Sequence, residues 1–394
     1  PSRAHSIKLT AESIRKRGFT DILSFFGSSS AAAGLSDVEV KDHIDRDLLK
    51  VDYRYVPTRS WFDVLTASLY VQNSLNHQYG YEGRSSAPAG QWTWRTRDTE
   101  YGEDTVGGTL QLESNFGKDT PHRLVYGLDF STSDVFSFKD GYNSAGAAFV
   151  PNKSFPDTDY QVLGAFLQDE VKFGSVSVTG GLRYDSFKLT PHADAYYTSQ
   201  NAAPPTTLSD SELSPKLGAV WKLSPQMQLF GQYAHGFRAP KPNQVNGGVT
   251  NLTASSGPYT SIGNPNLKPE TSDTVEFGVR GHMGASERNW YSVTAFHGRY
   301  KDFISSNVKV YDNPVNDPMD PDVFQSVNLN GVRISGFEVR GQWELSKGLT
   351  LTAAYAHAVG SEQDASGART PLVTVDPDKL VLGVRYDRGM QWGV

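Results

Sequence analysis

The segment VSVTGGLRYDS, residues Val176–Ser186, alternates apolar and polar side chains with a period of two. One face carries Val176, Val178, Gly180, Leu182 and Tyr184, and the other carries Ser177, Thr179, Gly181, Arg183 and Asp185. Successive side chains of a β-strand point to opposite sides of the sheet. The segment is therefore predicted to be a strand with one apolar face and one polar face.

The same alternation recurs along most of the chain and predicts an all-β protein. We expect about sixteen strands from this pattern. They are predicted near residues 48–56, 62–74, 92–101, 105–116, 121–133, 160–172, 175–187, 213–223, 226–236, 272–281, 289–300, 302–310, 324–330, 332–345, 348–359 and 378–388. One stretch looks helical, since Thr10 followed by AESIRKRGFTDILSFF has the form of a capped amphipathic turn or two.

The predicted connections are of two kinds. Short turns such as KFGS (172–175) and KLSPQM (222–227) join some strands. Long loops are expected at 134–159, 187–212, 237–271, 311–325 and 359–377.

Two architectures contain strands of this kind. A soluble β-sandwich buries its apolar faces between two sheets, and its strands are usually short. An outer-membrane barrel turns its apolar face to lipid and its polar face to a lumen, with short turns at one end and long loops at the other. Long predicted strands and unequal loops favour a transmembrane antiparallel β-barrel, which must close because lipid cannot satisfy an open sheet edge.

Composition excludes several classes of function. The 394 residues include no cysteine, 20% are charged, and the net charge is −6. Nucleic acid is not an expected partner, because such proteins carry a basic stripe. No apolar run reaches the roughly 18 residues of a transmembrane helix. We find no catalytic motif such as Gly-x-Ser-x-Gly or His-Glu-x-x-His, so an enzyme is not predicted and no catalytic residue or catalytic cofactor is assigned.

The longest predicted loop lies inside the stretch Tyr233–Gly281 and is bracketed by YAHGFRAPKPNQVNGG and NPNLKPETSDTVEFGVRG. These pieces resemble the TonB-dependent outer-membrane receptors. Further matching pieces follow in the family's order over about residues 160–394, among them LGAFLQDEV, VTGGLRYDSF and NGVRISGFEVRGQWELSKGLTLTAAYAHAVG.

The resemblance implies a 22-stranded barrel filled by an N-terminal plug domain. Residues 1–394 are then expected to be a partial barrel domain, with the plug and the final strands absent from this chain. It also implies a multi-pass protein of the Gram-negative outer membrane, in contact with its lipid and energised by the TonB complex through the plug.

Within that family, the FRAP and NPNL boxes resemble those of haem and haemoglobin receptors. The resemblance implies uptake of haem as a transported ligand, taken free or from a carrier such as haemoglobin. Such receptors usually carry a ligand histidine between the boxes, and this sequence has none between Arg238 and Pro269. Tyr259 is the side chain there that suits ferric haem, because a phenolate can be an axial ligand. We therefore predict Tyr259 as the haem-binding residue and expect no metal apart from that haem iron; the alternative is a loop tyrosine that contacts lipid or protein.

The two boxes have their own predicted role. Their prolines fix φ, and Arg238 and Glu270 are placed to pair across the loop, so the boxes are expected to anchor the loop near the ligand. The alternative is that Arg238 binds a haem propionate. The box residues are Phe237, Arg238, Ala239, Pro240, Asn264, Pro265, Asn266 and Leu267.

Two other functions fit the same barrel. The first is a ferric-siderophore receptor, which would be a transporter of the same family with a different cargo. The absence of the usual histidine favours this alternative. A passive porin or structural barrel needs neither cargo nor plug.

Overall fold

The computed structural model describes residues 4–23, 35–84, 92–145, 151–199, 204–251, 258–284, 286–313, 320–329, 331–363 and 367–387. These residues form strands and two short helices, α1 (Ala195–Thr198) and α2 (Pro242–Asn246). The strands of the larger sheet, called the wall below, are β1 (His5–Asp21), β2 (Leu35–Tyr55), β3 (Val64–Arg84), β4 (Trp94–Phe116), β5 (His122–Asp140), β6 (Asp157–Phe173), β7 (Val176–His192), β8 (Leu208–Ser224), β9 (Met227–Arg238), β12 (Glu270–His282), β13 (Trp290–Lys301), β16 (Val332–Ser346), β17 (Leu349–Gln363), β18 (Arg369–Pro371) and β19 (Lys379–Tyr386). The strands of the smaller sheet, called the inner sheet, are β10 (Gly248–Asn251), β11 (Tyr259–Ile262), β14 (Phe303–Tyr311) and β15 (Asp322–Leu329).

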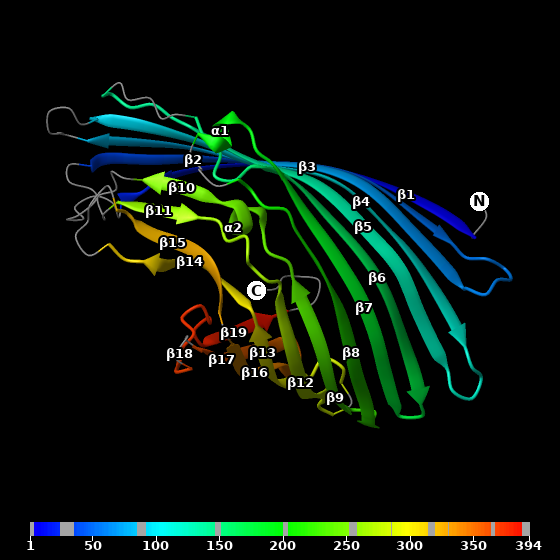
Figure 1. Ribbon diagram of the computed structural model, residues 1–394. Helices are drawn as coiled ribbons and strands as arrows, with labels where there is room; N and C mark the ends of the chain where they lie inside the picture. The colour runs from blue at the N-terminus through cyan, green and yellow to red at the C-terminus, as the bar shows by residue number, and fades with distance from the viewer. Residues whose placement is uncertain are drawn as a thin grey trace.

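The wall is a curved antiparallel sheet of 15 strands, and sequential neighbours pair along most of it (Figure 1). Strands β1 to β9 pair in order, followed by β12, β13, β16 and β17, and both β18 and β19 pair with β17. This confirms the predicted all-β class with a large antiparallel sheet. Among the described residues, no helix is long and apolar enough to cross a membrane.

The two ends of the wall differ in their connections, as predicted. At one end the turns are tight: β6 ends at Phe173 and β7 begins at Val176. Gly174 in that turn has φ of 59°, a left-handed value that glycine adopts without strain. At the other end β9 leads to β12 through α2, β10 and β11, and β13 leads to β16 through β14 and β15.

Large apolar side chains cover the outer face of the wall near the tight turns. Leu110, Leu128, Tyr184 and Leu213 lie on adjoining strands and remain 43–54% exposed. A continuous exposed apolar band is what a barrel presents to lipid over roughly 25 Å. Strand β4 alone has 23 residues, or roughly 75 Å at about 3.3 Å per residue, so the strands extend beyond this band toward the long connections.

The inner sheet lies on the concave side of the wall (Figure 1). Its strand order is β10-β11-β15-β14, and the β11–β15 pair is parallel. The sequence prediction that residues 302–310 and 324–330 are wall strands is therefore wrong. Period-two alternation does not say which sheet a strand joins, and β13 pairs directly with β16 without them.

A small apolar core joins the inner sheet to the wall. It consists of Leu189 from β7, Val245 from α2, Leu267 from the second box and Ile304 from β14, each at most 5% exposed. Burying a side chain of this size contributes about 1.5–3 kcal/mol, so this cluster helps to attach the long connections to the wall.

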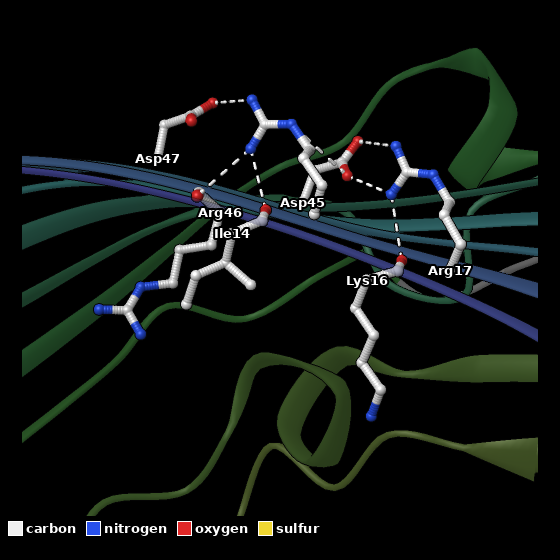
Figure 2. Close-up of polar contacts among 7 residues, drawn as sticks. Ile14, Lys16, Arg17, Asp45, Arg46 and Asp47 are labelled. Carbon is white, nitrogen blue, oxygen red and sulfur yellow. Dashed lines mark hydrogen bonds and ion pairs between the residues drawn. The ribbon is translucent and has the colours of Figure 1, made fainter.

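The predicted helical stretch after Thr10 is wrong, because β1 pairs with β2 from His5 to Asp21. Residues 24–26 of that stretch lie outside the described part of the chain. Cross-strand charge pairs help to explain the strand. Arg15 pairs with Asp47 at 2.7 Å, and Figure 2 shows Arg17 bound to Asp45. Arg15 also donates to the carbonyl oxygens of Ile14 and Arg46. Tertiary pairing has overridden a local helical pattern here.

Several strands are longer than predicted. The predicted strands 92–101 and 105–116 are one strand, β4, and β5 continues to Asp140. The loop predicted at 187–212 is shorter, because β7 reaches His192 and β8 begins at Leu208. These strands extend beyond the apolar band, where the simple apolar–polar alternation weakens.

Candidate ligand-binding site

The first box, Phe237–Pro240, begins at the end of β9 and is tied to β12. Arg238 and Glu270 are register partners, and the guanidinium donates two hydrogen bonds to the Glu270 carboxylate, one of them at 2.6 Å. Glu270 is only 8% exposed and also accepts a bond from the backbone N–H of Ile304 at 2.6 Å. The predicted Arg238–Glu270 pair is thus confirmed, and it raises the pKa of Arg238 above its ordinary value.

The second box, Asn264–Leu267, is fixed mainly by hydrogen bonds to backbone groups. The Asn264 amide donates to the carbonyl oxygen of Ser326 at 2.9 Å, and its side-chain oxygen accepts from the N–H of Asn266 at 3.0 Å. The N–H of Asn264 donates to the carbonyl oxygen of Gln244 in α2 at 3.0 Å. The two boxes are therefore joined to each other through α2.

Close backbone packing explains a glycine between β11 and the second box. A Cβ added at Gly263 would lie 2.3 Å from the carbonyl oxygen of Val245, a distance that real Cβ atoms do not show. Any larger residue there would push the box away from α2. The described parts of the loop between the boxes, residues 241–251 and 258–263, are thus packed together as a folded unit.

A cavity of about 660 Å³ lies between the first box and the inner face of the wall. The box side is formed by residues 237–243. The wall side includes Tyr101, Glu103, Tyr160, Arg183, Asp185 and Phe187. These wall residues come from β4, β6 and β7, and the period of two places Arg183, Asp185 and Phe187 on one face of β7.

Aromatic rings line much of this cavity, which we call the box cavity. Phe187 lies 5.9 Å from Phe237 across the gap between wall and box, and 6.3 Å from Tyr160 on β6, measured between ring centroids. Tyr101 lies 6.2 Å from Phe155, which also lines the cavity. An aromatic lining of this kind suits a flat apolar or aromatic ligand.

Both arginines of the cavity are already neutralised. Arg183 binds both carboxylate oxygens of Asp129 at 2.9 Å and both oxygens of Asp185 at 2.8 and 2.9 Å. Gly164 on the intervening strand makes this reach possible, because a Cβ there would lie 2.2 Å from an Arg183 nitrogen. Arg238 is bound by Glu270.

Two charged groups of the lining remain without an ion pair among the described residues. Lys241 is exposed on the box side, where its backbone N–H donates to Gln244. Glu103 on the wall side accepts one weak hydrogen bond from the Thr105 hydroxyl at 3.3 Å. The box cavity thus has a free cation on one surface and a free anion on the other.

Two phenols also face the cavity with no hydrogen-bond partner among the described residues. Burial, and then the charge of Glu103, raise the pKa of Tyr160 and that of Tyr101. Arg238 opposes the shift at Tyr160. Both phenols are therefore protonated at neutral pH and are available as hydrogen-bond donors.

Tyr259 lies elsewhere, at the start of β11. Its register partners are Asn251 on β10 and Asp322 on β15, and its ring meets Phe324 edge-on at 6.1 Å. It is half-buried and is not among the residues that line the box cavity. Arg97, near the start of β4, interacts electrostatically with Tyr259. Burial, and then the charge of Arg95, lower the pKa of Arg97, whereas Glu82 and Tyr259 raise it.

Sequence reasoning missed the wall side of the cavity. The residues concerned are far apart in the chain, and only the register of β4 to β7 brings them together. One signal was present: Phe187 and Leu189 continue the polar face of Arg183 and Asp185, and both are at most 2% exposed. Apolar residues on a lumen face predict that something covers them.

The chain belongs to the family described as TonB dependent receptor-like, beta-barrel, whose model matches residues 13–394. Proteins of this family lie in the Gram-negative outer membrane and act as receptors and transporters, not as enzymes.

Among curated proteins, the chain is 26% identical over 274 residues to the "Heme/hemopexin utilization protein C" of Haemophilus influenzae, with 67% of this chain and 36% of that protein covered. It is 26% identical over 297 residues to the "Hemin receptor" of Yersinia enterocolitica, with 71% and 37% covered. The chain therefore spans a little over a third of the length of these two relatives.

Among solved structures, the ferric citrate transporter FecA in its unliganded form superposes with a TM-score of 0.69 and 14% identity, with 99% of this chain and 54% of that chain covered. Identity at this level supports the shared fold alone.

Proposed function

We propose that the protein is an outer-membrane active transporter that takes up haem. The observation that carries the proposal is the likeness to relatives named for heme and hemin over about two thirds of the chain. The structure is compatible with it, since the two boxes and α2 form a folded unit beside a cavity of about 660 Å³, within the range of small-molecule sites.

We further propose Tyr259 as the axial ligand of the haem iron. A phenolate is a workable axial ligand of haem and favours ferric iron. The boxes, which hold both ends of the connection that carries β11, would keep Tyr259 in place.

Transport needs partners beyond this chain. We propose that energy comes from the TonB complex through a plug domain, as the family resemblance implies. Haem would reach the long connections either free or from a carrier protein such as haemoglobin. The polar side chains of the long connections suit contacts with the surface of such a carrier protein.

A ferric-siderophore receptor is the second candidate. It is favoured by one observation: no histidine lies between Arg238 and Pro269, where haem receptors usually carry a ligand. In that case the phenols and aromatic rings would contact an organic chelator and not a porphyrin.

Titration of the full-length receptor with hemin tests the proposal. The expected result is saturable binding with a Soret band and the charge-transfer features of a tyrosinate ligand, which Tyr259→Phe removes. Tyr311→Phe on the same inner sheet is the matched control, because its hydroxyl is held by Asp320 at 2.6 Å. Saturation by a siderophore with no hemin spectrum would reject haem as the cargo. Hemin binding that survives Tyr259→Phe with an unchanged spectrum would reject only the ligand assignment.

A further inference from the structure

The box cavity has the shape and the chemistry of a ligand site separate from Tyr259. It is bounded by two surfaces that are independently held: the register of β4 to β7 fixes the wall, and the Arg238–Glu270 pair with α2 fixes the box.

The aromatic rings of the cavity come from both surfaces. Phe187 and Tyr160 stand on the wall, and Phe237 faces Phe187 from the box. A flat ring system that packs against this aromatic cluster makes face or edge contacts with several of its rings, and each such aromatic pair contributes beyond simple burial.

The free charges of the cavity are also placed on opposite surfaces. Lys241 on the box has no anionic partner among the described residues, and Glu103 on the wall has no cationic one there. A ferric porphyrin has the matching arrangement, since its metal centre carries positive charge and its two carboxylates stand on one edge.

We propose that the box cavity is a cargo site for a ferric porphyrin, with its carboxylates at Lys241 and its metal centre on the side of Glu103. The phenol hydroxyls of Tyr101 and Tyr160 supply further hydrogen bonds to the ligand. The inference rests on the proposed haem cargo and adds a second position for that cargo, apart from the position where its iron would meet Tyr259. This site is distinct from the iron ligand assigned to Tyr259.

Two probes separate the roles of these residues in the full-length receptor. Hemin has both the metal and the carboxylates, and metal-free protoporphyrin IX has the carboxylates alone. Lys241→Gln is expected to weaken both probes by roughly 3- to 10-fold, as for loss of one charge-assisted contact. Glu103→Gln is expected to weaken hemin by roughly 3- to 5-fold and to leave the metal-free probe within about twofold of wild type.

The chain offers a matched control for Lys241. Lys268 is likewise exposed and likewise precedes a proline, but it does not line the cavity. Lys268→Gln is expected to bind both probes as wild type does. Heat-modifiable migration shows that each variant is folded before its binding is measured.

A bulky substitution gives a second test that is independent of charge. Val162 lines the cavity from β6, and Val162→Trp places an indole in the space that the porphyrin would fill. Loss of both probes from a folded Val162→Trp receptor is the expected result.

Equal effects of Lys241→Gln and Lys268→Gln, or unchanged binding in folded Val162→Trp, would overturn the cavity assignment while hemin uptake still stood. Failure of the wild-type receptor to bind either probe would instead reject the proposed haem function itself. The two failures are thus distinguishable in one set of titrations.

Discussion

Tyr160 and Tyr259 are both half-buried phenols in the part of the molecule that holds the two boxes, but they stand on supports of very different rigidity. Tyr160 belongs to β6, which pairs with β7 along 17 residues from Asp157 to Phe173. Tyr259 belongs to β11, a strand of four residues. The first position is fixed by the wall and the second by a small sheet on its concave side.

This difference indicates how the two proposed tasks are divided. A rigid surface suits recognition of the flat organic part of a ligand, because little ordering entropy is lost on binding. A short strand carried by a long connection suits capture, because it can adjust to a ligand without disturbing the wall. The substitutions predicted below each disrupt a different contact of the inner sheet or the boxes, and so test whether these two regions act separately.

Leu267→Ala is expected to have the largest effect on stability. It removes the side chain that the second box contributes to the core with Leu189 and Val245, where Leu267 is 2% exposed. Truncating a buried leucine costs about 2–4 kcal/mol at such sites. Hydrogen exchange should show faster opening of β11 and β15, with β6 and β7 unchanged. Equal loss of protection in β6 and β7 would contradict the separation of inner sheet and wall.

Glu270→Gln is expected to have an intermediate effect. The glutamine oxygen still accepts from the N–H of Ile304, but the charged bond to Arg238 is lost. Charged hydrogen bonds contribute about 1.5–3 kcal/mol, and the partial exposure of Arg238 reduces the expected cost to about 1–2 kcal/mol.

The readout for Glu270→Gln is the box cavity. Metal-free protoporphyrin IX should bind more weakly, while the tyrosinate spectrum of bound hemin should persist. Glu344→Gln is a control, because Glu344 pairs with Arg288 at 3.2 Å at the tight-turn end of the wall. If both substitutions weaken porphyrin binding alike, the box pair does not position the cavity.

A smaller, pH-dependent effect is expected at β15. The hydrogen bond from Lys309, and then that from the N–H of Asn313, lower the pKa of Asp322, which is the register partner of Tyr259. A carboxylate with a lowered folded-state pKa contributes stability above its unfolded pKa of about 4, and this stability is lost as the pH falls through the folded value.

Exchange of the β11 and β15 amides, corrected for intrinsic rates, should therefore accelerate below about pH 4 more than exchange in β6. Lys309→Met should remove most of this difference, because it removes the first-named cause of the shift. Identical pH profiles for wild type and Lys309→Met would contradict the assignment to this ion pair.

Much of the wall was predictable from the sequence, because a strand with one apolar face and one polar face alternates apolar and polar residues with a period of two. Arg183, Asp185 and Leu182 show this directly. The pairing of Arg238 with Glu270 was also predictable, since two opposite charges flank one long connection. The part of β1 from Thr10 to Asp21 was misread as helical, because cross-strand ion pairs at Arg15 and Arg17 have no local signature.

The cavity was not predictable in the same way. Glu103, Tyr160 and Lys241 are separated by long stretches of chain, and they meet only through strand register and the fold of the boxes. Residues 302–310 and 324–330 look like wall strands because an inner sheet has the same alternation. The Tyr259 assignment stays a prediction, since its environment is known and its ligand is not.

The most direct test of the central claim is the binding of metal-free protoporphyrin IX to wild-type receptor, Lys241→Gln and Tyr259→Phe. Because this probe has no iron, the account predicts that Lys241→Gln weakens its binding by roughly 3- to 10-fold and that Tyr259→Phe leaves it unchanged. Loss of binding in Tyr259→Phe, with full binding in Lys241→Gln, would contradict the account and place the whole cargo site on the inner sheet.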